Sequence, residues 1–318
     1  MSLPLAPPLQ PQLALSRNEL PGGDDYCYEI KLDGFRCLAF VDRAEVFLQS
    51  RNGRPLGRYF PELVFPSGRY VLDGEIVVRD ERGREDFDAL GQRIHPAVSR
   101  VELLSIQTPA VYVAFDLLAH HDEVLLELPF IERRAALERL LAEGFASAPV
   151  ELMPTVASPQ DAKQWLEHAE GAIAKERSAP YCPGERKGMV KVKRVRTIDA
   201  VLVGWRPGKA QGTVGALILG LYDDGELRVV GHCSGLSAAE KKRLVGFFAA
   251  YESGERGSAD PSRWSAGKEL QWIALRPELV VEIDFDHVSA GRIRHGAKLR
   301  RWREDKAPGE CTFDQLYV

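Results

Sequence analysis

The sequence has no long hydrophobic run. Its longest apolar stretch, at 214–221 (VGALILGL), is far shorter than the roughly 20 residues that a helix needs to span a bilayer, so we expect no membrane segment. The N-terminus is rich in proline and has no basic region before an apolar core, which is not typical of a signal peptide. These absences predict a cytoplasmic protein without membrane partners.

Cysteine is also scarce. The five cysteines are odd in number, widely spaced and never arranged as C-x-x-C, which fits neither a disulfide framework nor a zinc site, so we expect buried thiols. The composition, with 45% hydrophobic and 28% charged residues in 318, is that of an ordinary globular protein. This length favours two domains.

Positive charge is not in excess, but it is clustered. The formal net charge of −4 argues against bulk nucleic-acid binding. However, residues 185–209 carry eight basic against two acidic residues, and residues 292–306 carry seven against two. Two cationic strips on an acidic body favour a phosphate-rich ligand held in one place, although both strips could also be solvated surface.

The pattern of apolar residues predicts an N-terminal tail, at 1–24, followed by a first domain at 25–196. The tail is rich in proline and either extends freely or packs against the body. Strands are expected at 26–32, 37–40, 46–49, 70–78 and 111–118, and helices at 131–143 and 158–170. Mixed strands and helices indicate an α/β (α+β) domain.

From about Thr197 the pattern changes to a run of strands, expected at 200–205, 214–222, 226–231 and 279–288. Ser237 and Glu240 form a capping box that opens a helix reaching to about residue 251. A five-stranded OB-type barrel with one helix fits this order, as do other small barrels. The second domain is therefore predicted to be a small all-β barrel at 197–318.

One lysine stands in a context that suits nucleophilic chemistry. Lys31 lies in the string EIKLDGFR (29–36), on an alternating strand next to a glycine turn, where its amine could be partly desolvated. Desolvation and neighbouring cations favour the neutral amine, which is the nucleophilic form. An attack on phosphorus also needs cations to hold the phosphates. For any single lysine, a surface position before a turn is the alternative.

The string does not stand alone. Further motifs follow in order: SRNG (50–53), LDGEI (72–76), AFD (114–116), EGAIAK (170–175), KVK (191–193) and RWREDK (301–306). This ordered set resembles the covalent nucleotidyltransferase superfamily, and specifically the ATP-dependent DNA ligases. The resemblance covers residues 22–318 and is greatest to small bacterial and end-joining enzymes with only adenylation and OB domains. The N-terminal DNA-binding domain of larger eukaryotic ligases has no counterpart here.

The resemblance implies roles for the residues that would meet ATP. Lys31 would be adenylylated, Glu29 would accept a hydrogen bond from the adenine amine, and Phe115 would stack on the base. A carboxylate can accept from an N–H donor and an aromatic face suits a purine. Core packing is the alternative for Phe115.

The resemblance also implies which cations would hold phosphates. Arg36 and Arg51 would grip the sugar or phosphate of AMP and the 5′-phosphate at a nick, because their planar forks match phosphate oxygens. Arg51 could instead be a simple turn residue. Lys191 and Lys193 alternate on a strand, so both could contact the α-phosphate, or both could be solvated.

Carboxylates and a C-terminal motif complete the implied site. Glu75 and Glu170 would lie near the ribose and a divalent metal, Mg²⁺ or Mn²⁺, which prefers hard oxygen ligands. A buried salt bridge is the alternative for either. Arg303, Asp305 and Lys306 match R-x-D-K, which in the family orients the departing pyrophosphate. Because this motif lies in the barrel domain, the resemblance implies domain closure in the first step.

The resemblance thus predicts an ATP-dependent DNA ligase that seals nicks in duplex DNA through a lysine–AMP intermediate and a DNA-adenylate, in DNA repair or end joining. Its cofactors would be ATP and Mg²⁺ or Mn²⁺, and its partners a repair polymerase or a Ku-type protein, with the enzyme a monomer. An RNA ligase or a GTP-dependent capping enzyme is the alternative. A third alternative is a non-catalytic nucleic-acid-binding protein with an OB domain. It is disfavoured because such a protein needs neither the lysine nor the carboxylates.

Overall fold

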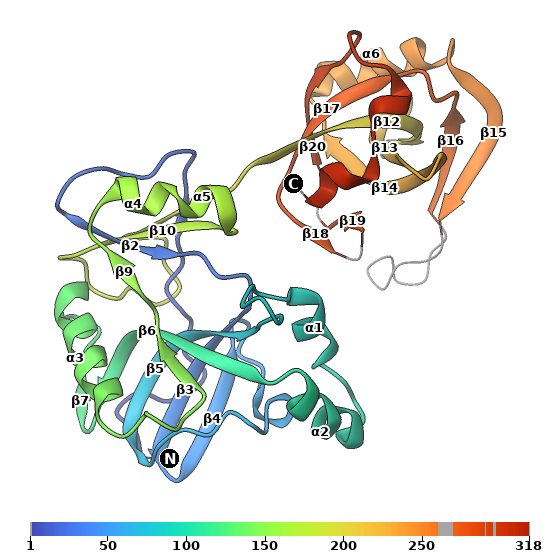
Figure 1. Ribbon diagram of the computed structural model, residues 1–318. Coiled ribbons are helices and arrows are strands. Elements are labelled where there is room, and N and C mark those ends of the chain that lie inside the picture. Colours follow the sequence, from blue (N-terminus) through green and yellow to red (C-terminus); the bar gives the residue numbers. More distant parts are fainter. Residues whose placement is uncertain (1, 260–269, 290, 295–296, 318) are drawn as a thin grey trace. The chain divides into compact units, whose positions relative to one another are not determined.

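The computed structural model describes residues 2–259, 270–289, 291–294 and 297–317 (Figure 1). The chain folds as two units, Met1–Arg194 and Val195–Val318. The division falls at the residues where the strand pattern of the sequence changes. Within the described residues, no helix is both long and apolar enough to cross a membrane.

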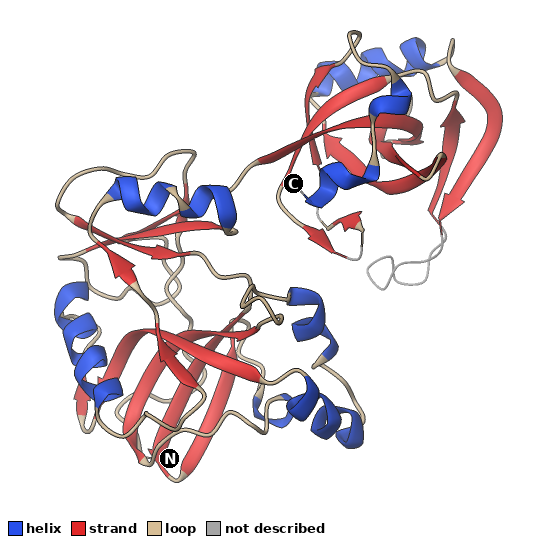
Figure 2. Ribbon diagram, in the orientation of Figure 1, coloured by secondary structure: helices blue, strands red, loops and turns tan. Residues whose placement is uncertain are grey.

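The larger sheet of the first unit is built mainly from the strands that alternation predicts. Its order is β4 (Glu45–Ser50), β3 (Phe35–Arg43), β5 (Gly68–Val78), β6 (Ala110–His120) and β7 (Glu123–Val124), all antiparallel, with β8 (Val150–Leu152) parallel to β6. Helix α3 (Phe130–Ala142) packs on this sheet, and α1 (Phe87–Gln92) and α2 (Val98–Gln107) follow β5 (Figure 2).

A smaller sheet of the same unit contains the lysine motif. Its order is β1 (Leu15–Ser16), β11 (Met189–Lys193), β10 (Gly171–Glu176), β2 (Tyr26–Ile30) and β9 (Thr155–Val156). Helices α4 (Pro159–Lys163) and α5 (Trp165–His168) cover one face, where Tyr28 and Ala174 are fully buried. Because strand residues alternate, the neighbours of Tyr28 and Ala174 face the other side, toward the larger sheet.

The N-terminal residues pack against the body of the first unit. Strand β1 pairs in parallel with β11, and the backbone of Leu9 exchanges hydrogen bonds with the side chain of Gln49. Gln12 is buried, and its backbone N–H donates to the hydroxyl of Tyr181. Of the two arrangements expected for the tail, the structure shows the packed one.

The second unit is a closed barrel. Strands β12 (Arg196–Pro207), β13 (Val214–Asp223), β14 (Glu226–Gly235), β20 (Ala297–Trp302) and β17 (Val280–Phe285) pair in a ring, because β17 pairs again with β12. The β14–β20 pair is parallel and the others are antiparallel. With α6 (Ala238–Phe248) between β14 and β17, this confirms the predicted five-stranded OB barrel. A hairpin of β15 (Glu252–Ala259) and β16 (Leu270–Leu275) extends the sheet.

Most expected elements are present within a few residues of their expected bounds. The expected helix at 158–170 is divided into α4 and α5 at Gln164, with Ser158 as N-cap and Pro159 at the first position. The elements that were not expected from the sequence include helices α1 and α2 and strands β10, β15, β16 and β20. The capping box of Ser237 and Glu240 is formed as predicted.

Candidate active site

A cavity of about 200 Å³ lies between the two sheets of the first unit. Strands β2, β5, β6, β10 and β11 contribute to its wall, and the N-terminal residues Pro11 to Ala14 close one side. The cavity brings together eight residues: Glu29, Lys31, Arg36, Arg51, Glu75, Phe115, Lys175 and Lys191. Seven of these are predicted site residues, and they come from five separate motifs of the sequence.

The strand register of the small sheet explains this convergence. Glu29 lies opposite Ile173 of β10, which lies opposite Lys191 of β11. Residues opposite each other on neighbouring strands share a face, so Glu29 and Lys191 both face the cavity. Lys31 follows β2 by one residue, and its backbone N–H donates to the carbonyl of Gly171 over 2.9 Å. It is two residues from Glu29 and shares its face.

Lys31 is held by an acidic neighbour that is shared with a second lysine. The Lys31 Nζ lies 3.4 Å from Glu170 Oε1 and 3.4 Å from the carbonyl of Leu32, and its side chain is 20% exposed. Lys193 Nζ lies 3.5 Å from the same Glu170 oxygen. One carboxylate therefore contacts both amines. Lys31 lines the cavity and its side chain remains accessible, whereas Glu170 and Lys193 are not among the residues of the cavity wall.

Two glycines make this close arrangement possible. A Cβ on Gly34 would collide with the carbonyl of Ile76, so only glycine lets the turn after Lys31 approach β5. Gly171 has φ of +151°, and a Cβ there would collide with the carbonyl of Val192 on β11. Glycine at both positions brings Lys31 close to its neighbouring strands.

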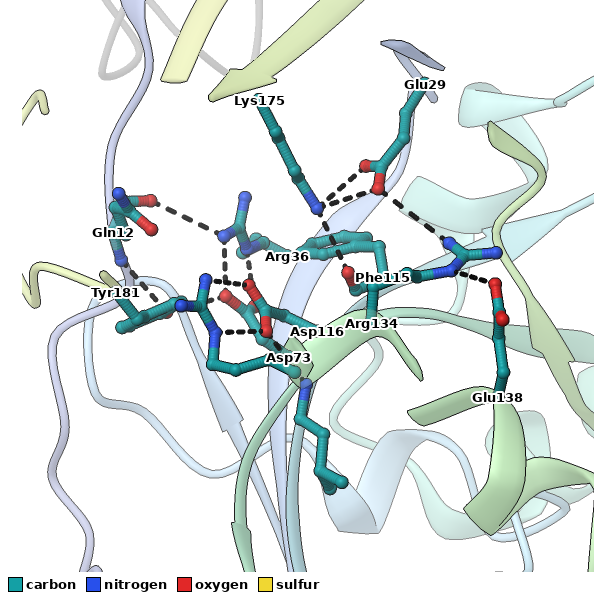
Figure 3. A network of polar contacts seen from close by, with 12 residues as sticks. Gln12, Glu29, Arg36, Asp73, Phe115, Asp116, Arg134, Glu138, Lys175 and Tyr181 are labelled. Atoms are coloured by element: carbon teal, nitrogen blue, oxygen red, sulfur yellow. Dashed lines mark hydrogen bonds and ion pairs between the residues drawn. The ribbon is translucent and has the colours of Figure 1, made fainter. Parts of the chain in front are cut away.

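Glu29 is buried and paired with a lysine for which the sequence suggested no role. Its carboxylate lies 2.8–2.9 Å from Lys175 Nζ, and the side chains of both residues are almost fully buried (Figure 3). Burial raises the pKa of Glu29, and the charge of Lys175 opposes this shift. Lys175 ends the motif EGAIAK, but its contact with Glu29 depends on the pairing of β10 with β2, which the sequence does not reveal.

Phe115 fits both of the roles that the sequence left open. It is 6% exposed and packs with Val77, Val113 and Met153, yet its ring lines the cavity. The guanidinium of Arg36 lies 4.4 Å from the ring centroid.

Arg36 is already engaged by a buried carboxylate. Its Nε and Nη2 each donate to an oxygen of Asp73 over 2.6 Å, and Nη2 lies 3.4 Å from the carbonyl of Gln12. Tyr181 donates to the same Asp73 over 2.6 Å. Arg36 is thereby fixed in orientation, and Asp73, Tyr181 and Gln12 are supporting residues that the sequence did not single out.

Glu75 and Lys191 are electrostatically perturbed. Burial raises the pKa of Glu75 to about 7, against the opposing charges of Arg36 and Lys31. Burial, together with the charges of Lys193 and Lys31, lowers the pKa of Lys191. Perturbed groups gathered in one cavity are typical of a functional site.

A second cavity of about 740 Å³ shares Lys31, Arg36, Arg51 and Glu75 with the first. Three further residues of its wall are Arg54, Arg58 and Tyr59. The exposed Arg51 lines both cavities.

The C-terminal motif is gathered around a carboxylate of β12. Arg303 Nη1 lies 2.7 and 2.9 Å from the two oxygens of Asp199, and Lys306 Nζ lies 3.0 Å from one of them. Arg303 also forms a double hydrogen bond with Asp305. Asp199 was not predicted, because it precedes the motif by about a hundred residues.

Part of the second cationic strip is neutralised. Arg300 and Arg301 form ion pairs with Glu282 of β17, and Arg300 also lies 3.7 Å from Asp284. Local sums of charge along the sequence therefore overstate the positive potential of this strip, because the compensating carboxylates come from another strand.

Two family models match most of the chain. Residues 10–193 match the family described as "ATP dependent DNA ligase domain", and residues 210–306 match "ATP dependent DNA ligase C terminal region".

Several named proteins are similar to this chain. DNA ligase C1 of Mycolicibacterium smegmatis is 43% identical over 99% of this chain and 96% of that protein. The multifunctional non-homologous end joining protein LigD of Pseudomonas aeruginosa is 33% identical over 96% of this chain, but only 37% of its own length is matched. A solved structure of mycobacterial DNA ligase D complexed with ATP and MES is 29% identical, with a TM-score of 0.53, and the match covers 96% of this chain and 98% of that one.

Proposed function

This chain belongs to the family of ATP-dependent DNA ligases, and we propose that Lys31 is the residue at which its reaction begins. The enzyme is a DNA ligase that uses ATP. The observation that carries the assignment of Lys31 is its accessible amine in a cavity that also holds Glu29, Phe115 and Lys191. Glu29 and Phe115 would form the adenine end of this cavity, and Lys191 would contribute to its phosphate end.

In the proposed first step, the neutral amine of Lys31 attacks the α-phosphorus of ATP. The N–P bond forms as the bond to pyrophosphate breaks, and the nitrogen releases one of its two protons to water. Lys191 and Lys193 would neutralise charge on the α-phosphate, since both lie on β11 close to Lys31. Glu29 would accept from the adenine amine and Phe115 would stack on the base.

In the proposed later steps, the 5′-phosphate at a nick attacks the lysine-bound AMP, which frees Lys31 and forms the DNA-adenylate. The 3′-hydroxyl then displaces AMP and forms the phosphodiester. Arg51 is suited to the 5′-phosphate because it lines the larger cavity as well as the smaller one. Each step is a phosphoryl transfer that depends on positioning and charge neutralisation.

The carboxylates fit a metal that arrives with the nucleotide. Among the residues that the structure describes, no group of three or more potential ligand side chains could hold an ion alone. Mg²⁺ commonly takes one or two carboxylates together with substrate phosphates. Glu75 and Glu170 would supply the protein oxygens for Mg²⁺ or Mn²⁺, and the bound ion would neutralise charge on the transferring phosphate.

The arrangement of the C-terminal motif supports its predicted role in the first step. Asp199 and Asp305 fix the orientation of Arg303, and Asp199 holds Lys306, so the two cations are presented together. Paired cations of fixed orientation suit the departing pyrophosphate.

Nick sealing with defined strands tests the substrate assignment. We expect the purified enzyme with ATP and Mg²⁺ to seal a nicked all-DNA duplex much faster than the same duplex with RNA strands. GTP should not replace ATP. Preferred sealing of the RNA duplex would instead support an RNA ligase, and labelling of the protein by GTP would support a capping-type enzyme.

The similarity to an end-joining protein favours a role in DNA repair or end joining, where a repair polymerase or a Ku-type protein would be the partner. The monomeric state and the cytoplasmic location expected from the sequence remain predictions. Size determination with and without DNA measures the first of these.

A further inference from the structure

Lys175 is a buried cation at the wall of the nucleotide cavity. Its ammonium contacts both oxygens of Glu29 at 2.8–2.9 Å and donates to the carbonyl of Phe115 over 3.0 Å (Figure 3). The ammonium also lies 4.5 Å from the ring centroid of Phe115, and its side chain is 4% exposed. It therefore holds the two residues proposed to meet the base.

We propose that Lys175 is a positioning residue that sets the purine specificity of this cavity, by keeping Glu29 an ionised acceptor that takes a 6-aminopurine and rejects a 6-oxopurine. This inference rests on the proposed contact of Glu29 with the base. Ile173 is the cross-strand partner of Glu29, and Lys175 lies two positions beyond it on β10. We assign to Lys175 the discrimination between ATP and nucleotides such as GTP.

The chemistry of position 6 explains why the charge of Glu29 matters. Adenine presents an amino group there, which donates hydrogen bonds, whereas guanine presents a carbonyl oxygen, which accepts them. An ionised carboxylate can only accept, but a protonated carboxyl has an O–H that donates. Ionised Glu29 thus matches adenine and repels a 6-oxo group, and protonated Glu29 tolerates the 6-oxo group.

The surroundings of Glu29 make its ionisation depend on Lys175. Burial favours the neutral carboxyl, and the charge of Asp116 on β6 acts in the same direction. Two cations oppose them: Lys175 on β10 is in direct contact, and Arg134 on α3 lies 3.9 Å away. Arg134 is itself tied to Glu138 over 2.7 Å. Lys175 is the closer cation and the one with hydrogen bonds to Glu29.

The test compares ATP with inosine triphosphate, whose base differs from adenine in carrying a 6-oxo group. The rate of covalent nucleotide attachment to the full chain is measured by intact mass at pH 6 and pH 8. We expect the wild-type enzyme to prefer ATP at least tenfold at both pH values. We expect K175M to lose at least tenfold of that preference at pH 6 and to lose less of it at pH 8, because a higher pH favours the ionised carboxylate of Glu29.

Two further variants test whether the charge of Lys175 is responsible for the preference. K175R keeps a cation and should keep the preference for ATP, and K175Q removes the charge but keeps a polar chain, so it should behave as K175M does. If K175M has a strongly lowered unfolding temperature, K175Q decides the question. A merely structural role of Lys175 would slow both nucleotides equally and leave the ratio unchanged at both pH values, which would overturn the proposal.

A variant of Glu29 separates this inference from the proposed function on which it rests. The amide of E29Q can both donate and accept, so it should lose the preference for ATP without any dependence on pH. If E29Q loses the preference and the neutral variants of Lys175 keep it, the role of Lys175 is wrong while the placement of the base stands. If E29Q keeps the wild-type preference, Glu29 does not meet the base and both fail.

Discussion

Glu75 lies where burial and charge act against each other. Its pKa is raised to about 7 by burial, although Arg36 and Lys31 lower it. The carboxyl is therefore mostly protonated below pH 7 and mostly ionised above it. Because a metal ligand must be ionised, metal affinity that depends on Glu75 should increase as the pH rises through 7.

The Mg²⁺ concentration that self-adenylylation requires measures this dependence on pH. From pH 6 to pH 8, the Mg²⁺ concentration that half-saturates self-adenylylation should fall by about tenfold more in the wild type than in E75Q. E75Q is the control, because protons that bind to the phosphates of ATP change the Mg²⁺ requirement of both proteins equally. Equal changes in both proteins would show that Glu75 is not a metal ligand.

The sequence identifies some residues of the site and misses others. Lys31, Glu29 and Phe115 stand in ordered motifs, and the cavity brings them together as expected. Lys175 and Asp199 were missed, because their importance comes from contacts with Glu29 and Arg303, which lie 146 and 104 positions away in the sequence. The order of the motifs therefore identifies the residues proposed to contact ligands better than it identifies the residues that hold them in position.

Among the structural elements, strand β10 depends on one glycine. Gly171 approaches β11 so closely that a Cβ would meet the carbonyl of Val192. We expect G171A to lower the free energy of unfolding by about 1–3 kcal/mol and to slow self-adenylylation, because the strands that place Lys31 and Lys193 must separate.

Denaturant unfolding and the rate of AMP attachment measure both effects. G91A is the matched control, because Gly91 lies in helix α1 with no atom within 4 Å of an added Cβ. It should be neutral or stabilise by up to about 1 kcal/mol. Equal stability of the two variants would mean that the glycine is not required for strand pairing.

The elements that the sequence predicted are those with a clear period or cap. Strand β5 alternates and α6 begins with a capping box, and both are present. Helix α2 was missed because it lacks a side-chain cap and leaves Val98, Leu103 and Ile106 exposed, so its apolar residues do not mark one face. The N-terminal residues pack through the pairing of β1 with β11 and through Leu3, Leu5 and Leu9, which contact the core.

At the scale of the whole molecule, the motif proposed to orient pyrophosphate lies in a different unit from Lys31. We expect D305A and K306A to slow self-adenylylation at least tenfold and to leave sealing of a pre-adenylylated nick nearly unchanged. The physical reason is that pyrophosphate is present only in the first step. Single-turnover rates of the two reactions measure this separation.

The neighbouring E304A is the control, because Glu304 is exposed and occupies the variable position of the R-x-D-K pattern. It should behave like the wild type in both assays. If D305A and K306A slowed sealing of the pre-adenylylated nick as much as self-adenylylation, the motif would have a role beyond the first step.

Division into a mixed unit and an OB barrel could be predicted from the change in strand pattern near Thr197. Closure of the barrel could not, because the parallel pairing of β14 with β20 joins strands about 65 residues apart with no local signal. The cationic strip on β20 was overestimated for a related reason, since its compensating carboxylates belong to β17.

The most direct test of the account is a pulse–chase of lysine-bound AMP. The wild-type enzyme is incubated with α-labelled ATP and Mg²⁺, freed of ATP, and mixed with a nicked DNA duplex, with K31A treated in parallel. We predict that the wild type carries one labelled AMP per chain, passes it to the 5′-phosphate of the nick and seals the strand, whereas K31A never gains the label. Labelling of K31A, or wild-type label that does not move to DNA, would contradict the assignment of Lys31.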